Sequence, residues 1–347
     1  MHERNDKHNL MAMNKVLLRW LDLYKWRIII AVVLILFSLL LATEPAWFIS
    51  AIDALRIPYA VFLVVLIVFF FIRGNNALTS ASVIALLILA PDIWPYFKTA
   101  DETPAEKKEE KREIVDADFS VLHFNVKEKN KNILSVAETA VQSEADIISL
   151  QELHETSLAA VDTVLKKKYP YALSDVSVKG FGMAVYSKYP IENGEVKKWN
   201  DYVFLTGTVQ LKNRTTRFIS ATTSTPTNGK DYAIQIKQFK YLTDYINSID
   251  SALIVMGDMN SVPWSEQIKT FMAHTSLEDS RKDLSATYPA QSPFQIPIDY
   301  IFHSKELDCK KFTTVGGSTS NHLGLLGYYN FSNSEKKDKI KIKDIIN

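Results

Sequence analysis

The sequence of 347 residues contains a single cysteine, Cys309. One cysteine excludes both an intramolecular disulfide framework and a cysteine-rich zinc site. The chain also has no excess of one charge, because 40 Lys and Arg residues stand against 39 Asp and Glu residues. The resulting net charge of +1 excludes a globally basic protein that wraps nucleic acid and an acidic disordered chain. Any affinity for phosphate must therefore be local.

Two catalytic motifs are absent as well. The sequence has no glycine-rich phosphate loop and no serine nucleophile elbow, which sets aside nucleoside-triphosphate and serine-hydrolase chemistry. The chain is nevertheless long enough for one large or two average domains with a sizeable core. What it does contain is divided between two unlike halves.

The first half, residues 1–97, holds three apolar runs without an internal charge, 28–42, 57–72 and 77–90. As helices these runs are about 21–24 Å long, which is shorter than a bilayer core of ~30 Å unless flanking residues join them. Trp20, Trp26 and Trp94 are among the aromatic residues that flank the runs, and such rings favour the headgroup level. A cleaved signal peptide would explain only the first run, and buried core helices are the other alternative. We predict a membrane anchor of three transmembrane helices at about 28–43, 57–73 and 77–95.

The charge of the short flanks predicts the orientation. Six basic residues precede the first run and outnumber three acidic ones. Since such an excess favours the cytoplasmic side, we expect a multi-pass protein of the inner or plasma membrane with a cytoplasmic N-terminus. Three crossings then place the C-terminal domain outside the cytoplasm, in the periplasm or the extracellular space.

Two charged segments frame that domain. Residues 98–116 alternate in charge and contain few large apolar residues, which is typical of a solvated linker, although an interaction tail has the same composition. Residues 331–347 form a basic tail that includes the Lys-Ile alternation KIKIK. This tail could pair as an edge strand or lie on an anionic lipid surface, and the sequence does not decide between them.

Residues 117–330 are expected to form the soluble domain. Apolar stretches typical of strands alternate there with a helical stripe at 133–141 and a helix over about 232–249. The expected strands are 119–124, 146–150, 182–187, 204–211, 217–221, 252–256 and 298–303. This order predicts an α+β or layered α/β fold.

Polar residues stand where several of these strands begin or end. Asn125, Glu152, Asp258, Asp299 and His322 are the clearest cases. A single Asp or Asn after a strand is usually a turn or cap residue. Several of them in one domain favour convergence on a site, because a polar group at the end of a buried strand needs a partner.

Taken in order, six segments resemble the endonuclease/exonuclease/phosphatase superfamily of metal-dependent phosphoesterases. They are HFNV at 123–126, DIISLQE at 146–152, GMAVYSKYPI at 182–191, GDMNSVPWS at 257–265, ATYPAQSPFQIPIDYIF at 286–302 and SNH at 320–322. The resemblance covers essentially all of 117–330. It implies a four-layered α/β sandwich of two packed mixed sheets flanked by helices, with the site at one end of the sheets.

The resemblance also implies roles for individual residues. Glu152 would be the principal ligand of Mg²⁺ (or Mn²⁺), a hard cation that prefers oxygen donors, with Asn125 beside the metal and the phosphate. Asp258 and Asn260 would position the attacking water and hold the phosphate. His322, oriented by Asp299, would act as base or proton partner on the scissile phosphate.

Two positions depart from the family pattern. Thr223, or its neighbour Thr222, stands where the family usually has a histidine that contacts the phosphate, and Asn321 replaces an aspartate near the metal. We still count Asn321 among the metal-site residues and Thr223 among the substrate-binding ones. Loss of an anionic ligand should weaken Mg²⁺ binding, and loss of one donor to the developing charge costs on the order of 10²–10³ in rate.

The expected function is therefore a membrane-anchored, Mg²⁺-dependent phosphodiesterase or nuclease-like hydrolase with an altered active site. The alternative is a catalytically impaired relative that acts as a binding module at the membrane. The expected partners are a phosphoester substrate and the lipid bilayer, and we infer no obligate protein partner. Lys127 and its basic neighbours Lys129 and Lys131 could contact the backbone phosphates of nucleic acid, or they could belong to a solvated loop whose charge Glu128 balances. The membrane anchor favours a phospholipid headgroup, but it could equally retain a nuclease at the cell surface. The remaining histidines, including His123 and His303, are interpreted as structural or surface residues.

Overall fold

The computed structural model describes residues 24–42, 52–97, 115–292, 294–316 and 320–332. The chain divides into two compact units, Met1–Pro95 and Tyr96–Asn347, and each is described by itself. Nearly all of the predicted linker and of the predicted basic tail lies outside the described residues.

Within residues 24–42 and 52–97, the described part of the first unit, three helices are long and apolar enough to cross a membrane, Tyr24–Ala42, Asp53–Ile72 and Asn76–Tyr96. The second and third consist of η1 (Asp53–Leu55) with α3 (Arg56–Ile72), and α4 (Asn76–Ile93) with η2 (Trp94–Tyr96). At 19 to 21 residues they span about 28–32 Å, which matches a hydrocarbon core. The flanking aromatic residues Tyr24, Trp26 and Trp94 belong to these helices, and the first helix therefore begins before the expected residue 28.

Few side chains of this unit are buried. Leu34, Leu63 and Leu89 are among those that pack together, whereas Phe71 and Ile72 are 72% and 77% exposed. The guanidinium of Arg56 at the start of α3 forms ion pairs with Asp53 and Asp92. Because Asp92 lies near the end of α4, this contact joins the same end of two antiparallel helices.

The second unit is built on two six-stranded sheets. The first sheet has the order β11-β12-β1-β2-β4-β3 and the second the order β5-β6-β7-β8-β10-β9. Both are mixed, since β1 runs parallel to β2 and β7 parallel to β8, whereas the other pairs are antiparallel. The strands are β1 (Phe119–Asn125), β2 (Ile147–Gln151), β3 (Tyr171–Asp175), β4 (Met183–Ser187), β5 (Ile191–Trp199), β6 (Tyr202–Leu211), β7 (Arg214–Ala221), β8 (Ala252–Asp258), β9 (Glu278–Asp279), β10 (Asp299–His303), β11 (Leu307–Val315) and β12 (Gly324–Phe331).

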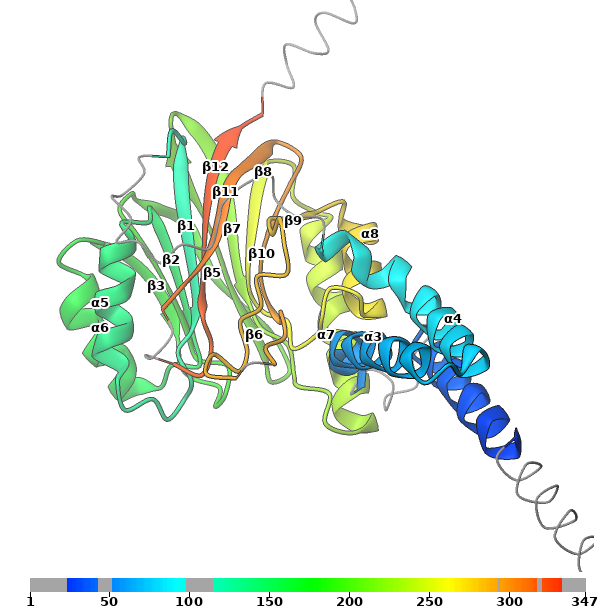
Figure 1. Cartoon of the computed structure of the whole chain (residues 1–347). Helices are drawn as coiled ribbons and strands as arrows, with labels where there is room; N and C mark the ends of the chain where they lie inside the picture. The colour runs from blue at the N-terminus through cyan, green and yellow to red at the C-terminus, as the bar shows by residue number, and fades with distance from the viewer. Residues whose placement is uncertain (1–23, 43–51, 98–114, 293, 317–319, 333–347) are drawn as a thin grey trace, which may run out of the picture. The chain divides into compact units, whose positions relative to one another are not determined.

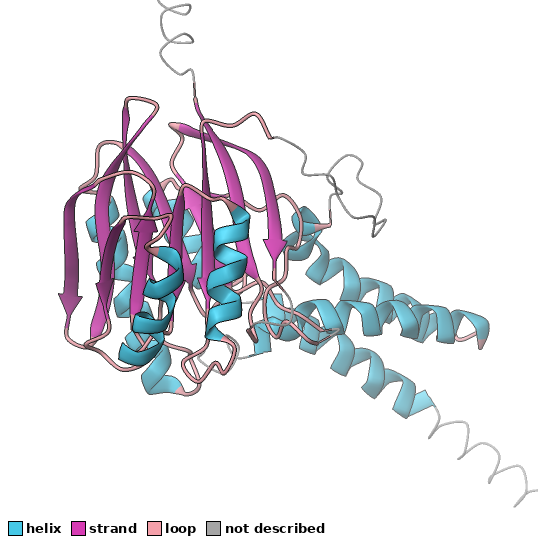
Figure 2. Cartoon of the chain, turned by 90° about the vertical axis from the view of Figure 1, so that its left-hand side faces the viewer, coloured by secondary structure: helices cyan, strands magenta, loops and turns pink. Residues whose placement is uncertain are grey.

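Four helices cover the outer faces of the two sheets (Figures 1 and 2). Two of them, α5 (Ile133–Ser143) and α6 (Glu155–Leu165), pack on the first sheet, where Val136 and Val161 join a core cluster with Leu150. The others, α7 (Gly229–Ile246) and α8 (Glu266–Thr275), pack on the second sheet. The result is the expected sandwich of two mixed sheets between helical layers.

A third cluster fills the space between the sheets, and it is formed by residues that alternate along the strands. The inward positions are apolar at one end of the sandwich and polar at the other. Phe119 and Val121 are followed on β1 by His123 and Asn125, and Phe218 is followed on β7 by Ser220. The same change occurs on β2, from Ile147 to Ser149 and Gln151, and on β8, from Ile254 and Met256 to Asp258. The polar end of this interface is where a site can form.

Candidate active site

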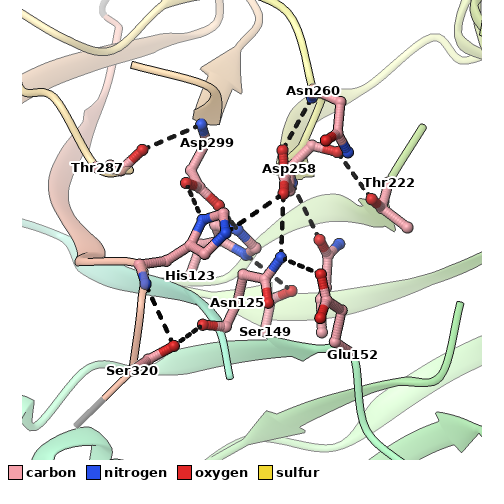
Figure 3. A network of polar contacts seen from close by, with 12 residues as sticks. His123, Asn125, Ser149, Glu152, Thr222, Asp258, Asn260, Thr287, Asp299 and Ser320 are labelled. Atoms are coloured by element: carbon pink, nitrogen blue, oxygen red, sulfur yellow. Dashed lines mark hydrogen bonds and ion pairs between the residues drawn. The ribbon is translucent and has the colours of Figure 1, made fainter. Parts of the chain in front are cut away.

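Sheet topology brings the polar strand ends together. Because β1 and β2 are parallel, as are β7 and β8, Asn125, Gln151 and Asp258 all lie at carboxyl ends of central strands. The antiparallel strand β10 begins at the same edge, with Asp299 directly opposite Asp258. Five segments that are distant in the sequence therefore meet at one end of the sheet interface (Figure 3).

Asn125 joins two carboxylates in this cluster. Its Nδ2 donates to Glu152 Oε1 at 2.8 Å and to Asp258 Oδ2 at 3.0 Å. Glu152 Oε2 also accepts from the backbone N–H of Glu128 at 3.0 Å. Asn125 and Asp258 are 1% and 2% exposed, whereas Glu152 is only partly buried. The pair of carboxylates is thus anchored inside the sandwich and open toward solvent at Glu152.

Three residues around this cluster have left-handed backbone conformations. Lys127, Glu152 and Asn260 have φ values of 65°, 62° and 48°, and each lies one or two residues beyond the end of a strand. Such left-handed conformations of residues other than glycine cost of order 1 kcal/mol or more each and are common at functional sites. The strain is offset by the hydrogen bonds that hold Glu152 and Asn260 in place.

Gln151 ties the two sheets together beneath the site. Its Oε1 accepts from the backbone N–H of Asp258 at 3.0 Å, and its Nε2 donates to the carbonyl of Ala221, also at 3.0 Å. The amide group therefore bridges β7 and β8 just beyond their last ladder pair, Ser220 and Met256. Gly257 permits this approach, since a Cβ atom there would lie 1.6 Å from Ala221 O.

Asp299 and His322 form a buried ion pair. His322 Nδ1 lies 2.8 Å from Asp299 Oδ2, and its Nε2 lies 3.9 Å from Asp258 Oδ2. The ring of Tyr288 packs on the imidazole at 4.7 Å between ring centroids. These contacts fix the ring with Nε2 directed toward the carboxylate of Asp258.

The charged groups of this cluster shift one another's pKa values. Burial lowers the pKa of His322, but the carboxylates of Asp299 and Asp258 outweigh burial and raise it to about 9. Burial raises the pKa of Asp299, yet contacts with His322 and His123 lower it below its ordinary value. For Asp258, burial and the negative charge of Asp299 raise the pKa. A protonated His322 beside an ionised Asp299 is the resulting state at neutral pH.

The two threonines at the end of β7 support the backbone that carries Asp258. Thr222 Oγ1 donates to Asp258 O at 2.8 Å, and Thr223 Oγ1 donates to Met259 O at 2.6 Å. Asn260 is held by the same loop, because its Nδ2 donates to Thr223 O and its Oδ1 accepts from Thr225 Oγ1, both at 2.8 Å. The predicted substrate contacts of Thr223 and Asn260 stay predictions.

Two further predicted residues lie at the rim of the cluster. Asn321 is partly buried, and its Oδ1 accepts from Ser320 Oγ at 3.4 Å. Ser320 Oγ also donates to Asn125 O at 2.9 Å, which links the segment before His322 to the end of β1. Lys127 is exposed, and its backbone N–H donates to Asn125 Oδ1 at 3.0 Å.

Among the described residues, Asp258, Asp299 and His322 offer ligand atoms within 4.8 Å of one another, as a metal site requires. The ion pair between His322 and Asp299 argues against a cation there, because a protonated imidazole repels it. Glu152 and Asp258 supply carboxylate oxygens, the donors that Mg²⁺ prefers, and the Nδ2 of Asn125 lies between them. The cluster thus has an acidic side around Glu152 and a proton-carrying side around His322.

Sequence reasoning missed three buried residues of the cluster. His123 Nε2 lies 3.3 Å from Asp299 Oδ1, and its Nδ1 lies 3.4 Å from Ser149 Oγ. Ser149 Oγ lies 2.8 Å from Ser220 Oγ on the other sheet. Each of the three interrupts an apolar strand at an inward position, and this shared period of two is the signal that could have found them.

Comparison with known proteins identifies relatives of the second unit. A model of the Endonuclease/Exonuclease/phosphatase family matches residues 122–322. Among curated proteins no match is found.

Solved structures share the fold at low sequence identity. An endonuclease/exonuclease/phosphatase family protein of Bacteroides thetaiotaomicron is 15% identical, with a TM-score of 0.53 over 62% of this chain and 96% of its own. A mannosyl-6-phosphatase of the same species is also 15% identical, with a TM-score of 0.53 over 61% and 100% of the two chains. TDP2 of D. rerio, in complex with a single-strand DNA product, gives the same identity and TM-score over 61% and 98%. At these identities the likeness demonstrates the fold alone.

Proposed function

This chain belongs to the endonuclease/exonuclease/phosphatase family, and we propose that it is a membrane-anchored phosphoesterase that uses Mg²⁺ or Mn²⁺. The observation that carries the proposal is the joining of Glu152 and Asp258 through Asn125, next to the Asp299–His322 pair. Domain 117–330 would supply the chemistry, and the matched residues 122–322 lie within it.

The donor set fits a hard divalent cation. Glu152 and Asp258 each present a carboxylate to the same Asn125 amide, and the partial exposure of Glu152 gives a cation access from solvent. Glu152 and Asn125 would hold the ion, with Asn321 as the predicted third residue. When bound, the ion neutralises charge on the phosphate oxygens and lowers the pKa of a water molecule.

The residues of the chain would handle the proton and the phosphate. Asp299 holds the imidazole of His322 by its Nδ1, so that Nε2 faces the acidic side of the cluster. With a pKa raised to about 9, His322 carries a proton that can stabilise a developing negative charge or pass to the leaving oxygen. Asp258, with a raised pKa, is placed to accept a proton from an attacking water.

The departures at Thr223 and Asn321 predict a slow enzyme. Position 223 has a threonine and therefore no imidazole to contact the phosphate. The Thr223 hydroxyl instead donates to the carbonyl of Met259. This observation also favours the second candidate, a family member that binds a phosphoester or a cation without turnover. Retained Mn²⁺ binding without hydrolysis over a broad panel of phosphoesters would select that candidate.

The membrane anchor and its orientation belong to the same proposal. The three apolar helices and the basic excess before the first of them favour an inner or plasma membrane location with the domain outside the cytoplasm. An alkaline-phosphatase fusion after Lys98 should be active. An inactive fusion would refute the orientation.

Substrates of two kinds fit a phosphoesterase held at a membrane, nucleic acid and phospholipid headgroups. The similar solved structures include a mannosyl-6-phosphatase and a protein in complex with a DNA product. The fold alone therefore does not distinguish between the two kinds of substrate. Activity that falls steeply with salt would indicate nucleic acid. Activity that requires lipid presented in detergent would indicate headgroups.

Hydrolysis of a generic phosphodiester by the purified full-length protein tests the central activity. We expect turnover of bis(p-nitrophenyl) phosphate with Mg²⁺ or Mn²⁺, its loss in EDTA, and a decrease of about 10²–10⁴-fold in His322→Ala. His274→Ala is a matched control, because His274 is an exposed histidine on α8. Equal rates for wild type and His322→Ala would exclude the assigned role of His322.

A further inference from the structure

The carboxylate of Asp299 contacts two imidazole rings, and only His322 has a role in the chemistry proposed above. The second ring is that of His123, in β1 of the opposite sheet, whose Nε2 lies 3.3 Å from Asp299 Oδ1. His322 uses the other oxygen, Oδ2. His123 and Asp299 are both 0% exposed. A buried histidine between two sheets is costly unless both ring nitrogens are bonded.

A chain of buried hydrogen bonds leads from Gln151 to this histidine. The orientation of the Gln151 amide is set, because its Oε1 accepts from the backbone N–H of Asp258. Gln151 Nε2 must therefore donate, and Ser220 Oγ accepts from it at 3.3 Å. Ser220 Oγ and Ser149 Oγ are 2.8 Å apart, and Ser149 Oγ is 3.4 Å from His123 Nδ1.

The direction of each bond follows from the chemistry at the two ends. A carboxylate can only accept, so His123 must present Nε2–H to Asp299. If Nδ1 is unprotonated, it accepts from Ser149, Ser149 accepts from Ser220, and Ser220 accepts from Gln151. Every hydroxyl in the chain then donates once and accepts once.

The other protonation states of His123 do not fit this chain. An Nδ1–H tautomer would set a bare ring nitrogen against the Asp299 carboxylate, two acceptors with no hydrogen between them. A doubly protonated ring would make Ser149 an acceptor and turn its hydroxyl toward Ser220. Ser220 would then accept from both Ser149 and Gln151, and its own hydroxyl hydrogen would have no acceptor among the residues of this hydrogen-bond series.

We propose that His123 is a positioning residue of this site: by donating its Nε2–H to the Asp299 carboxylate, it fixes Asp299 so that Asp299 can hold His322 in its working orientation. The inference deepens the proposed function and rests on it for the meaning of that orientation. The hydrogen-bond chain itself does not depend on turnover. His123 thus connects Gln151, whose amide bridges β7 and β8 beneath the acidic side, to the Asp299–His322 pair.

The tautomer can be read on the wild-type protein without any variant. Full-length protein carrying ¹⁵N-histidine, in detergent micelles, gives two-bond ¹H–¹⁵N correlations that distinguish Nδ1–H from Nε2–H rings. His123→Gln and His322→Gln identify the two signals by their loss. We expect a hydrogen on Nε2 of His123, and a His123 ring protonated at Nδ1 alone overturns the proposal.

Variants test the positioning role itself. His123→Phe removes the donor, whereas His123→Gln keeps an N–H near the position of Nε2. We expect His123→Phe to alter the His322 Nδ1–H resonance and to lower kcat for bis(p-nitrophenyl) phosphate about 10- to 100-fold with little change in KM. His123→Gln should retain most of the wild-type kcat and a His322 Nδ1–H resonance close to that of wild type.

His303→Phe is the matched control. His303 is a buried histidine on β10 whose Nδ1 bonds Ser280 Oγ at 2.9 Å, so this change has the same size without removing a bond to Asp299. An unchanged His322 resonance in folded His123→Phe, or an equal change in His303→Phe, overturns the proposal. Should wild type show no turnover while the resonances behave as expected, the phosphoesterase assignment fails and the positioning of Asp299 by His123 stands.

Discussion

The two ends of the space between the sheets are built on the same strands and differ in what they do. At one end Phe119, Val121 and Phe218 fill the interface with apolar surface. At the other end His123 and Ser220 occupy the next inward positions of those strands. The apolar end contributes burial energy, which is insensitive to geometry at the level of single bonds. The polar end depends on every donor finding its acceptor, and this requirement holds the polar side chains of the cluster in place.

Paired substitutions on β7 measure this difference most strongly. Phe218→Ala should lower the free energy of unfolding by about 3–5 kcal/mol through the loss of buried surface and the cavity left behind. Ser220→Ala, two residues further along the same strand, should cost about 1 kcal/mol, because it removes hydrogen bonds without leaving a large cavity. Denaturant unfolding of the full-length protein in detergent compares them. Equal losses would mean that the two ends are not energetically distinct.

The polar end should also make stability depend on pH. The pKa of His322 is about 9 in the folded protein, above its ordinary value of 6.5. Its contribution to stability is therefore complete below pH 6.5 and is lost as the pH rises through 9, a change of about 3 kcal/mol. Unfolding in EDTA between pH 6 and 10 should show this decrease in wild type and in Phe218→Ala. The His322→Gln variant should lack this decrease in stability. An equal decrease in that variant would show that the titration of His322 is not its cause.

The smallest expected effect concerns the altered acidic side. Asn321→Asp restores a carboxylate at the position where the family usually has one and keeps the acceptor for Ser320 Oγ. Because affinity for a hard cation rises with ligand charge, Mn²⁺ should bind roughly tenfold more tightly, at a free-energy gain of about 1.4 kcal/mol. Isothermal titration of the two proteins measures it. No gain in affinity would place Asn321 outside the metal site.

Much of the fold and part of the site could be predicted from the sequence. Most of the central strands are largely apolar, so their positions were predictable, and so was the meeting of Asn125, Glu152 and Asp258 at their ends. The central strand β12 (Gly324–Phe331) was not among the expected strands. The expected ends differ by a few residues, as for the helix expected at 232–249 and observed as α7 (Gly229–Ile246). Edge strands such as β5 (Ile191–Trp199) were missed, because most of its residues are exposed and polar.

The interior of the polar end was harder to predict. A serine or histidine within an apolar strand usually faces solvent, and periodicity alone cannot show that both faces of a strand are covered. His123 was therefore interpreted as a structural or surface residue, and its contact with Asp299 comes from a strand 176 positions away. The hydrogen bonds that occupy Thr223 and Asn260 depend likewise on loop geometry, which the sequence pattern does not specify.

The central claim is that the acidic side of the polar cluster holds a divalent cation at Glu152. Titration of full-length protein in detergent with Mn²⁺, followed by electron paramagnetic resonance, tests it without reference to any substrate. We predict one Mn²⁺ site in wild type that is weakened at least about tenfold in Glu152→Gln and unchanged in Glu138→Gln, which alters an exposed residue on α5. Absence of Mn²⁺ binding in wild type, or equal binding in wild type and Glu152→Gln, would contradict the account.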